Sequence, residues 1–185
     1  FIRSPVTLSK NVLLEEELSC SLIVSAYKSC NISVENYFKK IDSVKIYKCL
    51  DTGYRFYYPF NLSGNAKLYE ELQARPGYYR LKLEHQTAKQ FIKSNDEVLE
   101  IGCGSGYFLR SLKDEEIRCT GIEFNPAAVL TALNKGIKVI KQDIASHAVE
   151  NAGNYDVVCS FQVLEHVSAV NEFISDSLMP LKKGG

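Results

Sequence analysis

The second half of the chain alternates short apolar runs with segments whose apolar residues recur at helical spacing. Apolar runs bounded by glycine or polar residues are typical of strands in a buried parallel sheet. The predicted strands are 97–101, 119–123, 138–141 and 155–161. The predicted helices are 107–112, 126–134, 144–151 and 168–178. Strand and helix thus alternate four times, which predicts an α/β fold with a doubly wound parallel sheet and helices on both faces.

The first half has a different pattern. The segments 35–41, 44–50 and 54–60 are rich in Tyr, Phe, Val and Ile and are separated by polar turns, which predicts a three-stranded antiparallel meander. A short helix is predicted over 66–73, with Asn65 as its N-cap. Nine of the 11 Tyr but only three of the 11 Gly precede residue 83. This shift predicts two domains, a β-meander and helical module over 1–83 and an α/β domain over 84–185.

Charge and cysteine content narrow the function classes. The chain has 22 basic and 22 acidic residues, and this balance argues against a nucleic-acid partner held by phosphate attraction. The longest apolar run, around 22–26, is too short to cross a bilayer. Six cysteines spread over 185 residues favour a reducing compartment over a disulfide scaffold. We therefore expect a soluble cytoplasmic protein with no membrane partner. Its oligomeric state has no signature in the sequence.

A glycine-rich loop carries the strongest chemical signal. Gly102, Gly104 and Gly106 follow the first predicted strand of the α/β domain directly. Such a loop brings the backbone close to a ligand, whereas the alternative is an ordinary tight turn. A dinucleotide fingerprint would place its third glycine where Tyr107 stands, so a pyrophosphate is disfavoured. Glu123 ends the second strand at the spacing of a ribose-binding carboxylate, and its alternative is a solvated strand end. Together these residues predict a nucleoside site.

Residues 97–185 resemble the class I S-adenosylmethionine-dependent methyltransferases that act on small molecules. The loop matches the first motif of that family, an acidic residue followed by Gly-x-Gly-x-Gly. Its further motifs are matched by 121–126, 142–144, 155–167 and 181–185. The sheet of that family has seven strands. The resemblance therefore implies that this chain, which ends before the fifth, is a fragment with an incomplete acceptor pocket.

The resemblance also implies a set of site residues and S-adenosyl-L-methionine as the cofactor. The residues implied to bind it are Glu100, Gly102, Cys103, Gly104, Gly106, Glu123, Phe124, Asp143, Ile144, Phe161, Gln162 and Tyr79. Within this set Glu123 would bind the ribose and Asp143 the adenine amino group. His166, just beyond the fourth strand, would be the catalytic base for the acceptor. The alternative for His166 is a packing role at the start of a helix.

The N-terminal half also resembles the small zinc-binding module that precedes some methyltransferase domains. Cys30 and Cys49 stand where two Cys-x-x-Cys knuckles would begin, but Ser33 and Thr52 replace the second cysteine of each. A structural zinc ion requires four ligands, so we predict no metal. The module would be a degenerate zinc ribbon that covers the cofactor domain or shapes the acceptor site.

These observations predict an S-adenosylmethionine-dependent methyltransferase with a small-molecule acceptor, such as a sugar or a natural-product intermediate. Two alternatives stay open. An NAD-dependent oxidoreductase is disfavoured by Tyr107, and a non-enzymatic module that binds a nucleoside or a partner is compatible with every motif.

Overall fold

The computed structural model describes every residue except 1, 74 and 76–81. The chain divides into two compact units, and each is described by itself. The first comprises Phe1–Arg75 with Glu165–Asn171, and the second comprises Pro76–Leu164 with Glu172–Gly185.

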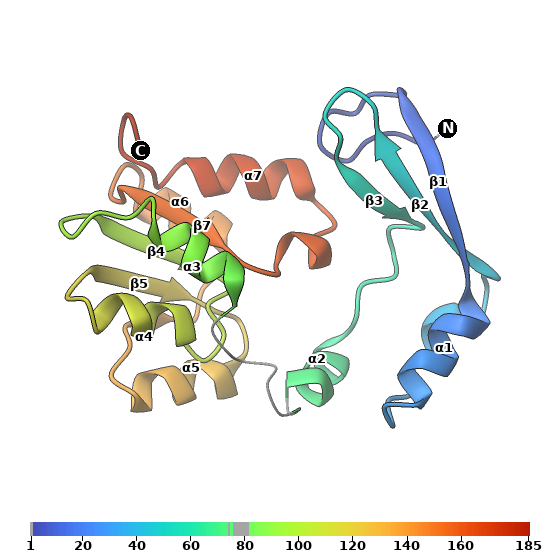
Figure 1. Cartoon of the computed structure of the whole chain (residues 1–185), viewed down its shortest axis with the longest axis horizontal. Helices are drawn as coiled ribbons and strands as arrows, with labels where there is room; N and C mark the ends of the chain where they lie inside the picture. The colour runs from blue at the N-terminus through green and yellow to red at the C-terminus, as the bar shows by residue number, and fades with distance from the viewer. Residues whose placement is uncertain (1, 74, 76–81) are drawn as a thin grey trace. The chain divides into compact units, whose positions relative to one another are not determined.

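The first unit is built on a three-stranded antiparallel sheet with the order β1-β2-β3 (Figure 1). Its strands are β1 (Val12–Ser19), β2 (Ser43–Cys49) and β3 (Arg55–Tyr58), and its helices are α1 (Cys20–Lys28), the 3-10 helix η1 (Glu35–Phe38) and α2 (Ala66–Gln73). The predictions for β2, β3 and α2 are confirmed, and Asn65 Oδ1 accepts a hydrogen bond from Leu68 N at 3.0 Å.

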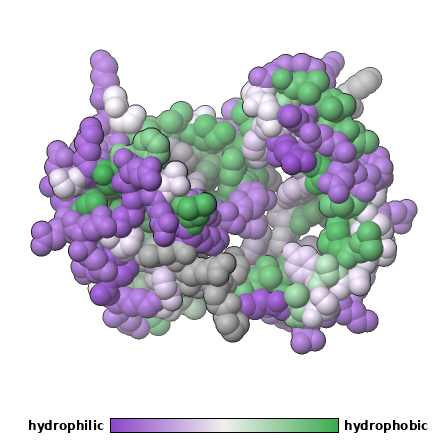
Figure 2. All heavy atoms as spheres, in the orientation of Figure 1, coloured by the Kyte–Doolittle hydropathy of each residue, from purple (hydrophilic) through white to green (hydrophobic). Residues whose placement is uncertain are grey.

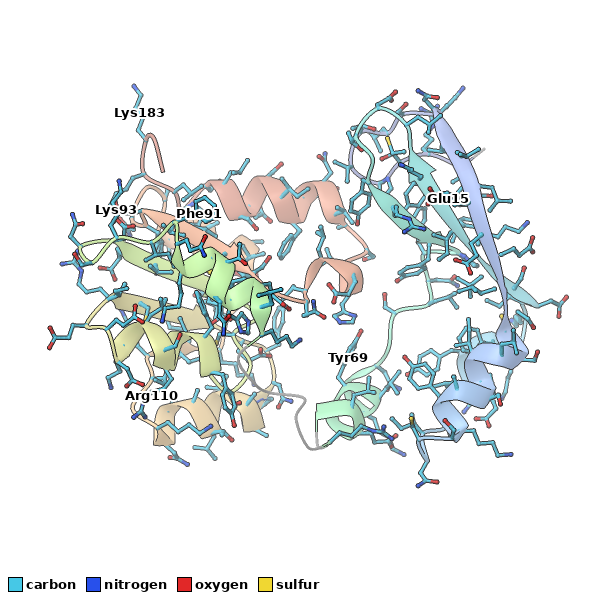
Figure 3. All side chains as sticks on the ribbon, viewed as in Figure 1. Glu15, Tyr69, Phe91, Lys93, Arg110 and Lys183 are labelled. Carbon is cyan, nitrogen blue, oxygen red and sulfur yellow. The ribbon has the colours of Figure 1, made fainter. Side chains whose placement is uncertain are left out.

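The predicted strand 35–41 is wrong, because its first part forms η1 and the third strand of the sheet is β1. A β-bulge explains why β1 lacks the alternating pattern of a half-buried strand. The pairing with β2 shifts between Leu14 and Glu16, which leaves Glu15 as the extra residue. The Glu15 carboxylate accepts a hydrogen bond from Arg55 Nε at 2.6 Å (Figure 3).

The likeness to a zinc ribbon finds no support in the structure. Cys30 is exposed beyond the end of α1, whereas Cys49 is buried at the end of β2. Cys49 Sγ lies 3.7 Å from Thr7 Oγ1, so the segment that meets Cys49 is the N-terminal turn and not the turn at Cys30. In the part of the chain that the structure describes, no three His, Cys, Asp or Glu side chains are placed to hold a metal ion.

The second unit contains a parallel four-stranded sheet with the order β6-β5-β4-β7. Its strands are β4 (Glu97–Ile101), β5 (Arg118–Ile122), β6 (Val139–Ile140) and β7 (Val157–Ser160). The helices of this unit are α3 (Leu83–Lys89), α4 (Tyr107–Lys113), α5 (Pro126–Asn134), α6 (Ile144–Glu150) and, from Glu172 onward, α7 (Val170–Leu178). The 3-10 helix η2 (Leu164–His166) begins in this unit and ends in the first. Every strand and helix predicted from 97 onward is present, so the doubly wound α/β fold is confirmed.

Helices cover both faces of this sheet (Figure 1). On one face Val98 packs against Phe108 and Leu112 of α4 and against Ala88 of α3. On the other face Leu99 and Ile101 pack in a cluster with residues of α6 and α7. The alternation of side chains along β4 therefore divides the core into two layers.

The order of the strands sets the position of a ligand site. Along the chain, β4 is followed by β5 on one side and then by β6 beyond it. The next strand, β7, lies on the other side of β4. In open α/β sheets ligands bind beyond the carboxyl ends of the strands, at the point where the order reverses. Here that point lies between β4 and β7.

Large apolar side chains also lie on the surface. In the first unit the exposed ones include Leu13, Leu14 and Leu22, and Figure 2 shows hydrophobic patches in green among the hydrophilic residues. Among the described helices, none has the length and hydropathy that a membrane span requires.

Candidate functional site

The loop from β4 to α4 is held against the ends of two neighbouring strands. Gly102, Gly104 and Gly106 all have left-handed backbones, with φ of 71°, 54° and 76°. A Cβ added at Gly102 would lie 2.5 Å from Val163 Cγ2, so the turn after β7 lies directly against this glycine. Gly102 N and Cys103 N both donate hydrogen bonds to Ile122 O at the end of β5. The loop therefore needs glycine for its conformation and for its close packing.

Glu123 connects this loop to the segment after β5. Its Oε2 accepts a hydrogen bond from Gly104 N at 2.8 Å. Its Oε1 accepts from Phe124 N at 2.8 Å and from Asn125 N at 2.9 Å. A carboxylate has about four acceptor positions, so three such bonds leave capacity for a ligand. The side chain is half-buried and holds the glycine loop in place.

Glu100 places an acidic group beneath the same loop. The residue is 4% exposed, and its Oε2 has no hydrogen-bond partner among the described residues. Burial, with a smaller contribution from the charge of Glu123, raises the pKa of Glu100 to about 8. The carboxyl group is therefore mostly protonated at neutral pH. An unpaired polar atom in such a place is costly, and a ligand could provide its missing partner.

Three thiols near Glu100 remain protonated. Burial, followed by the charge of Glu100, raises the pKa of Cys103, Cys119 and Cys159. For Cys119 the resulting pKa is about 11. Since the thiolate is the nucleophilic form, none of these cysteines is suited to covalent catalysis. Cys103 instead packs in an apolar cluster with Leu109 and Val139.

Asp143 and Ile144 lie beyond the end of β6, at the start of α6. Asp143 is the N-cap, and its two oxygens accept hydrogen bonds from Ser146 N at 2.7 Å and Ser146 Oγ at 3.0 Å. These bonds lower the pKa of Asp143, the bond from Ser146 N most of all. Ile144 packs against the apolar cluster that contains Leu99 and Ile101.

Phe161 and Gln162 follow β7. Phe161 meets the rings of Phe108 and His85 edge-on, with centroids 4.9 and 4.5 Å apart. Gln162 has a φ of 56°, which is strained for a residue other than glycine, and its Nε2 donates to Glu84 Oε1 at 3.4 Å. Such strain is frequent at functional sites.

Phe124 is 68% exposed directly after Glu123, an unusual position for a large aromatic ring. This ring stands next to the carboxylate that holds the glycine loop. It therefore offers an apolar surface for a flat ligand at the end of β5.

His166 belongs to the first unit and meets Tyr69 of α2 there. His166 Nδ1 lies 2.8 Å from Tyr69 Oη, and the two rings are edge-on with centroids 4.9 Å apart. Tyr69 projects from α2 in Figure 3. Tyr79, which was predicted to contact the cofactor, lies outside the described residues.

The structure thus brings some of the predicted residues together by direct contact. Gly102 and Cys103 bond to the end of β5, and Glu123 bonds to Gly104. Asp143 is bonded instead to Ser146 of its own helix.

The sequence analysis did not identify three residues that contact residues of the candidate site or pack beside them. Val163 packs on Gly102, His85 is buried against Phe108, and Tyr69 holds His166 across 97 residues of sequence. Each partner is distant in the sequence, so no local motif marks the pairing.

Comparisons with known proteins agree with this arrangement. A relative from Vibrio parahaemolyticus named ubiquinone biosynthesis O-methyltransferase is 38% identical over 95 residues, covering 48% of this chain and 40% of that protein. The chain therefore spans about 40% of the length of the curated relatives it matches. A crystal structure of a Pyrococcus horikoshii protein is 18% identical with a TM-score of 0.53, covers 64% of this chain and 62% of that one, and has the same fold. A SAM-dependent methyltransferase from Archaeoglobus fulgidus is 26% identical with a TM-score of 0.48, over 54% of this chain and 48% of that one.

A protein family described as a methyltransferase domain matches residues 72–185, which is more than half of the 185 residues. This stretch contains the whole glycine loop, Glu123 and the turn after β7. The chain belongs to the methyltransferase-domain family.

Proposed function

We propose that the intact protein transfers a methyl group from S-adenosyl-L-methionine to a small-molecule acceptor, and that this chain binds the nucleoside of the donor. The observation that carries the proposal is the loop of three left-handed glycines tied by Glu123 to the end of β5. Such a loop brings backbone close to a ligand at the position where open α/β sheets bind nucleotides.

The residues of this site fit a nucleoside that carries an amino-acid group. Glu123 retains acceptor capacity for the hydroxyls of a ribose, and Phe124 offers an exposed ring beside it. The Glu100 oxygen that has no partner among the described residues is available to a polar group of the ligand. Tyr107 stands where a dinucleotide loop needs glycine, which disfavours a pyrophosphate.

Asp143 is proposed to accept a hydrogen bond from the adenine amino group. Its two oxygens each accept one bond from Ser146, and each oxygen retains a lone pair. The N-cap bonds fix the carboxylate at the end of β6 and keep it ionised, since they lower its pKa. Cys103, Ile144, Phe161, Gln162 and Tyr79 complete the proposed donor site.

When bound, the donor supplies a methyl group on a sulfonium, which is already electrophilic. The chain therefore needs only to hold donor and acceptor in line and to exclude water. His166 is proposed to take the proton from the acceptor as its oxygen attacks the methyl carbon.

The proposed acceptor is a hydroxyl group on a small molecule. The Vibrio relative, 38% identical over 95 residues, is named as an O-methyltransferase, which supports this class. The equal numbers of acidic and basic residues, 22 of each, argue against a nucleic-acid acceptor.

The six free cysteines favour a cytoplasmic location for the protein. We propose that 84–185 bind the donor and that the module over 1–83 covers the cofactor domain or helps to shape the acceptor site.

Calorimetric titration of the intact protein with S-adenosylmethionine, S-adenosylhomocysteine and NAD tests the proposal. We expect saturable one-to-one binding of the first two and none of NAD. Binding of NAD alone would replace the proposal with a nicotinamide-dependent oxidoreductase. If none of the three binds, the protein has no site for these nucleoside ligands, and the proposal is refuted.

A further inference from the structure

Tyr69 and His166 form a side-chain pair that no motif in the sequence marks. Tyr69 lies on α2, and His166 ends η2 in the same unit. The pair has a hydrogen bond of 2.8 Å between Tyr69 Oη and His166 Nδ1. It also has edge-on ring packing at an interplanar angle of 75°. Two contacts of different kinds fix both the position and the rotation of the imidazole.

We propose that Tyr69 is a positioning residue that keeps His166 in the tautomer with Nδ1 protonated and Nε2 free to accept a proton. In this arrangement His166 Nδ1–H donates to the phenol oxygen. The hydrogen bond made by one ring nitrogen decides which form the other takes. Since Tyr69 occupies Nδ1, Nε2 is the nitrogen left for a ligand.

Glu165 is the charged neighbour of Nε2. Its Oε1 lies 3.9 Å from His166 Nε2, beyond hydrogen-bond distance. The two charged or titratable groups that the described contacts place against His166 are Tyr69 and Glu165. The His166 side chain is 41% exposed.

The role of the pair in taking the acceptor proton rests on the proposed function, whereas the tautomer does not. In the proposed proton transfer, the O–H bond of the acceptor breaks and the proton forms a bond to Nε2 of His166. The imidazolium then donates from Nδ1 to Tyr69 and faces Glu165. Replacing the phenol with a phenyl ring retains the edge-on packing and removes the hydroxyl that holds Nδ1–H.

The test is the nitrogen-15 NMR spectrum of the imidazole rings in the intact protein, where the three histidines of this chain are assigned by substitution. In the parent, His166 should show a protonated Nδ1 and an unprotonated Nε2. In Tyr69→Phe the signals should shift toward the form protonated at Nε2. Tyr58→Phe is the matched control, because Tyr58 also packs edge-on against a ring, that of Phe60, and should leave His166 unchanged.

The signals of His85 and His147 report whether Tyr69→Phe stays folded. A parent spectrum with the proton on Nε2, or one that Tyr69→Phe leaves unchanged, overturns the inference. Titration with S-adenosylhomocysteine tests the proposed function separately from the tautomer of His166. Equal affinity in the parent and Tyr69→Phe supports a role for the pair apart from the donor. No binding in the parent removes the proposed function, and the assignment of the pair to an acceptor proton with it, while the tautomer stands as measured.

Discussion

Glu123 shows how one side chain can serve both the fold and a ligand. Its carboxylate accepts from Gly104, Phe124 and Asn125, so it fixes the backbone on two sides of the proposed ribose position. Hydrogen bonds to a charged group contribute about 1.5–3 kcal/mol each. Replacing this carboxylate therefore affects the loop as well as any direct bond to a ribose.

Substitution of Glu123 should weaken donor binding more than the loss of an ordinary surface charge. We expect Glu123→Ala to weaken S-adenosylhomocysteine binding by roughly ten- to a hundredfold, since each 1.4 kcal/mol is a factor of ten. Glu123→Gln should lose less, because it keeps one oxygen acceptor. Calorimetry measures both, with Glu172→Ala, an exposed carboxylate on α7, as the control. Parent-like affinity in Glu123→Ala would remove Glu123 from the site.

Glu100 should make stability decrease as the pH rises. Its pKa is raised to about 8 in the folded chain, from a reference value of 4.5. Between these values the folded state holds a proton that the unfolded state has released, so the free energy of unfolding falls as the pH increases. Glu100→Gln removes this dependence. Its stability relative to the parent, measured by urea unfolding, should therefore be greater at pH 8 than at pH 5. A pH-independent difference would contradict the raised pKa.

At the scale of elements, the join between β4 and α4 depends on glycine for two separable reasons. Gly102 has a φ of 71°, and an added Cβ would lie 2.5 Å from Val163 Cγ2. Gly153 has a φ of 69°, and no atom of the described residues lies within 4 Å of an added Cβ. The two positions share the backbone strain and differ in the steric contact.

Gly102→Ala should accordingly be more destabilising than Gly153→Ala. Both incur about 1–3 kcal/mol of backbone strain. Only Gly102→Ala also pushes the turn after β7 away from the loop, so we expect a lower urea midpoint and weaker S-adenosylhomocysteine binding for this variant alone. Val163→Ala combined with Gly102→Ala should recover part of the loss. Equal destabilisation by the two single substitutions would show that the contact with Val163 is unimportant.

Elements with strong local signals were predictable, and those that depend on distant partners were not. Asn125 and Pro126 predict the start of α5, and Asn125 Oδ1 does accept from Ala127 N at 2.9 Å. The strand β1 was not predicted, because the bulge at Glu15 interrupts the alternation of apolar and polar residues and most residues of β1 are exposed.

The residues of the candidate site likewise include some that local sequence patterns predict and some that they do not. The spacing of the motif in the sequence predicts the glycine loop and Glu123. The contact between Tyr69 and His166 could not be predicted in this way, because the fold brings together two residues that are distant in the sequence.

At the scale of the whole molecule, two buried histidines should make the chain sensitive to acid. Burial lowers the pKa of His85 and His147, and His147 Nε2 lies 3.0 Å from Tyr155 Oη. Below the reference value of 6.5 the unfolded chain binds protons that these folded histidines exclude, so the free energy of unfolding falls with the pH.

Urea unfolding at about pH 6 and pH 5 measures this dependence in a Glu100→Gln background, which removes the opposing effect of Glu100. Cys49, whose pKa is lowered to about 6 by hydrogen bonds from Thr52 and Ser4, titrates at the upper end of this range and acts in the same direction, so the background also carries Cys49→Ser. We expect lower stability at pH 5. Equal or higher stability at pH 5 would mean that the histidines are not buried in their neutral form.

A crystal structure of the intact protein with S-adenosylhomocysteine tests the central claim most directly. We expect the adenosine at the carboxyl ends of β4 and β5, with its ribose hydroxyls on Glu123 and its adenine amino group on Asp143. We also expect a partner for the Glu100 oxygen that has none in the described part of the chain. Adenosine bound away from the glycine loop, or a Glu123 carboxylate with no contact to the ribose, would contradict the account.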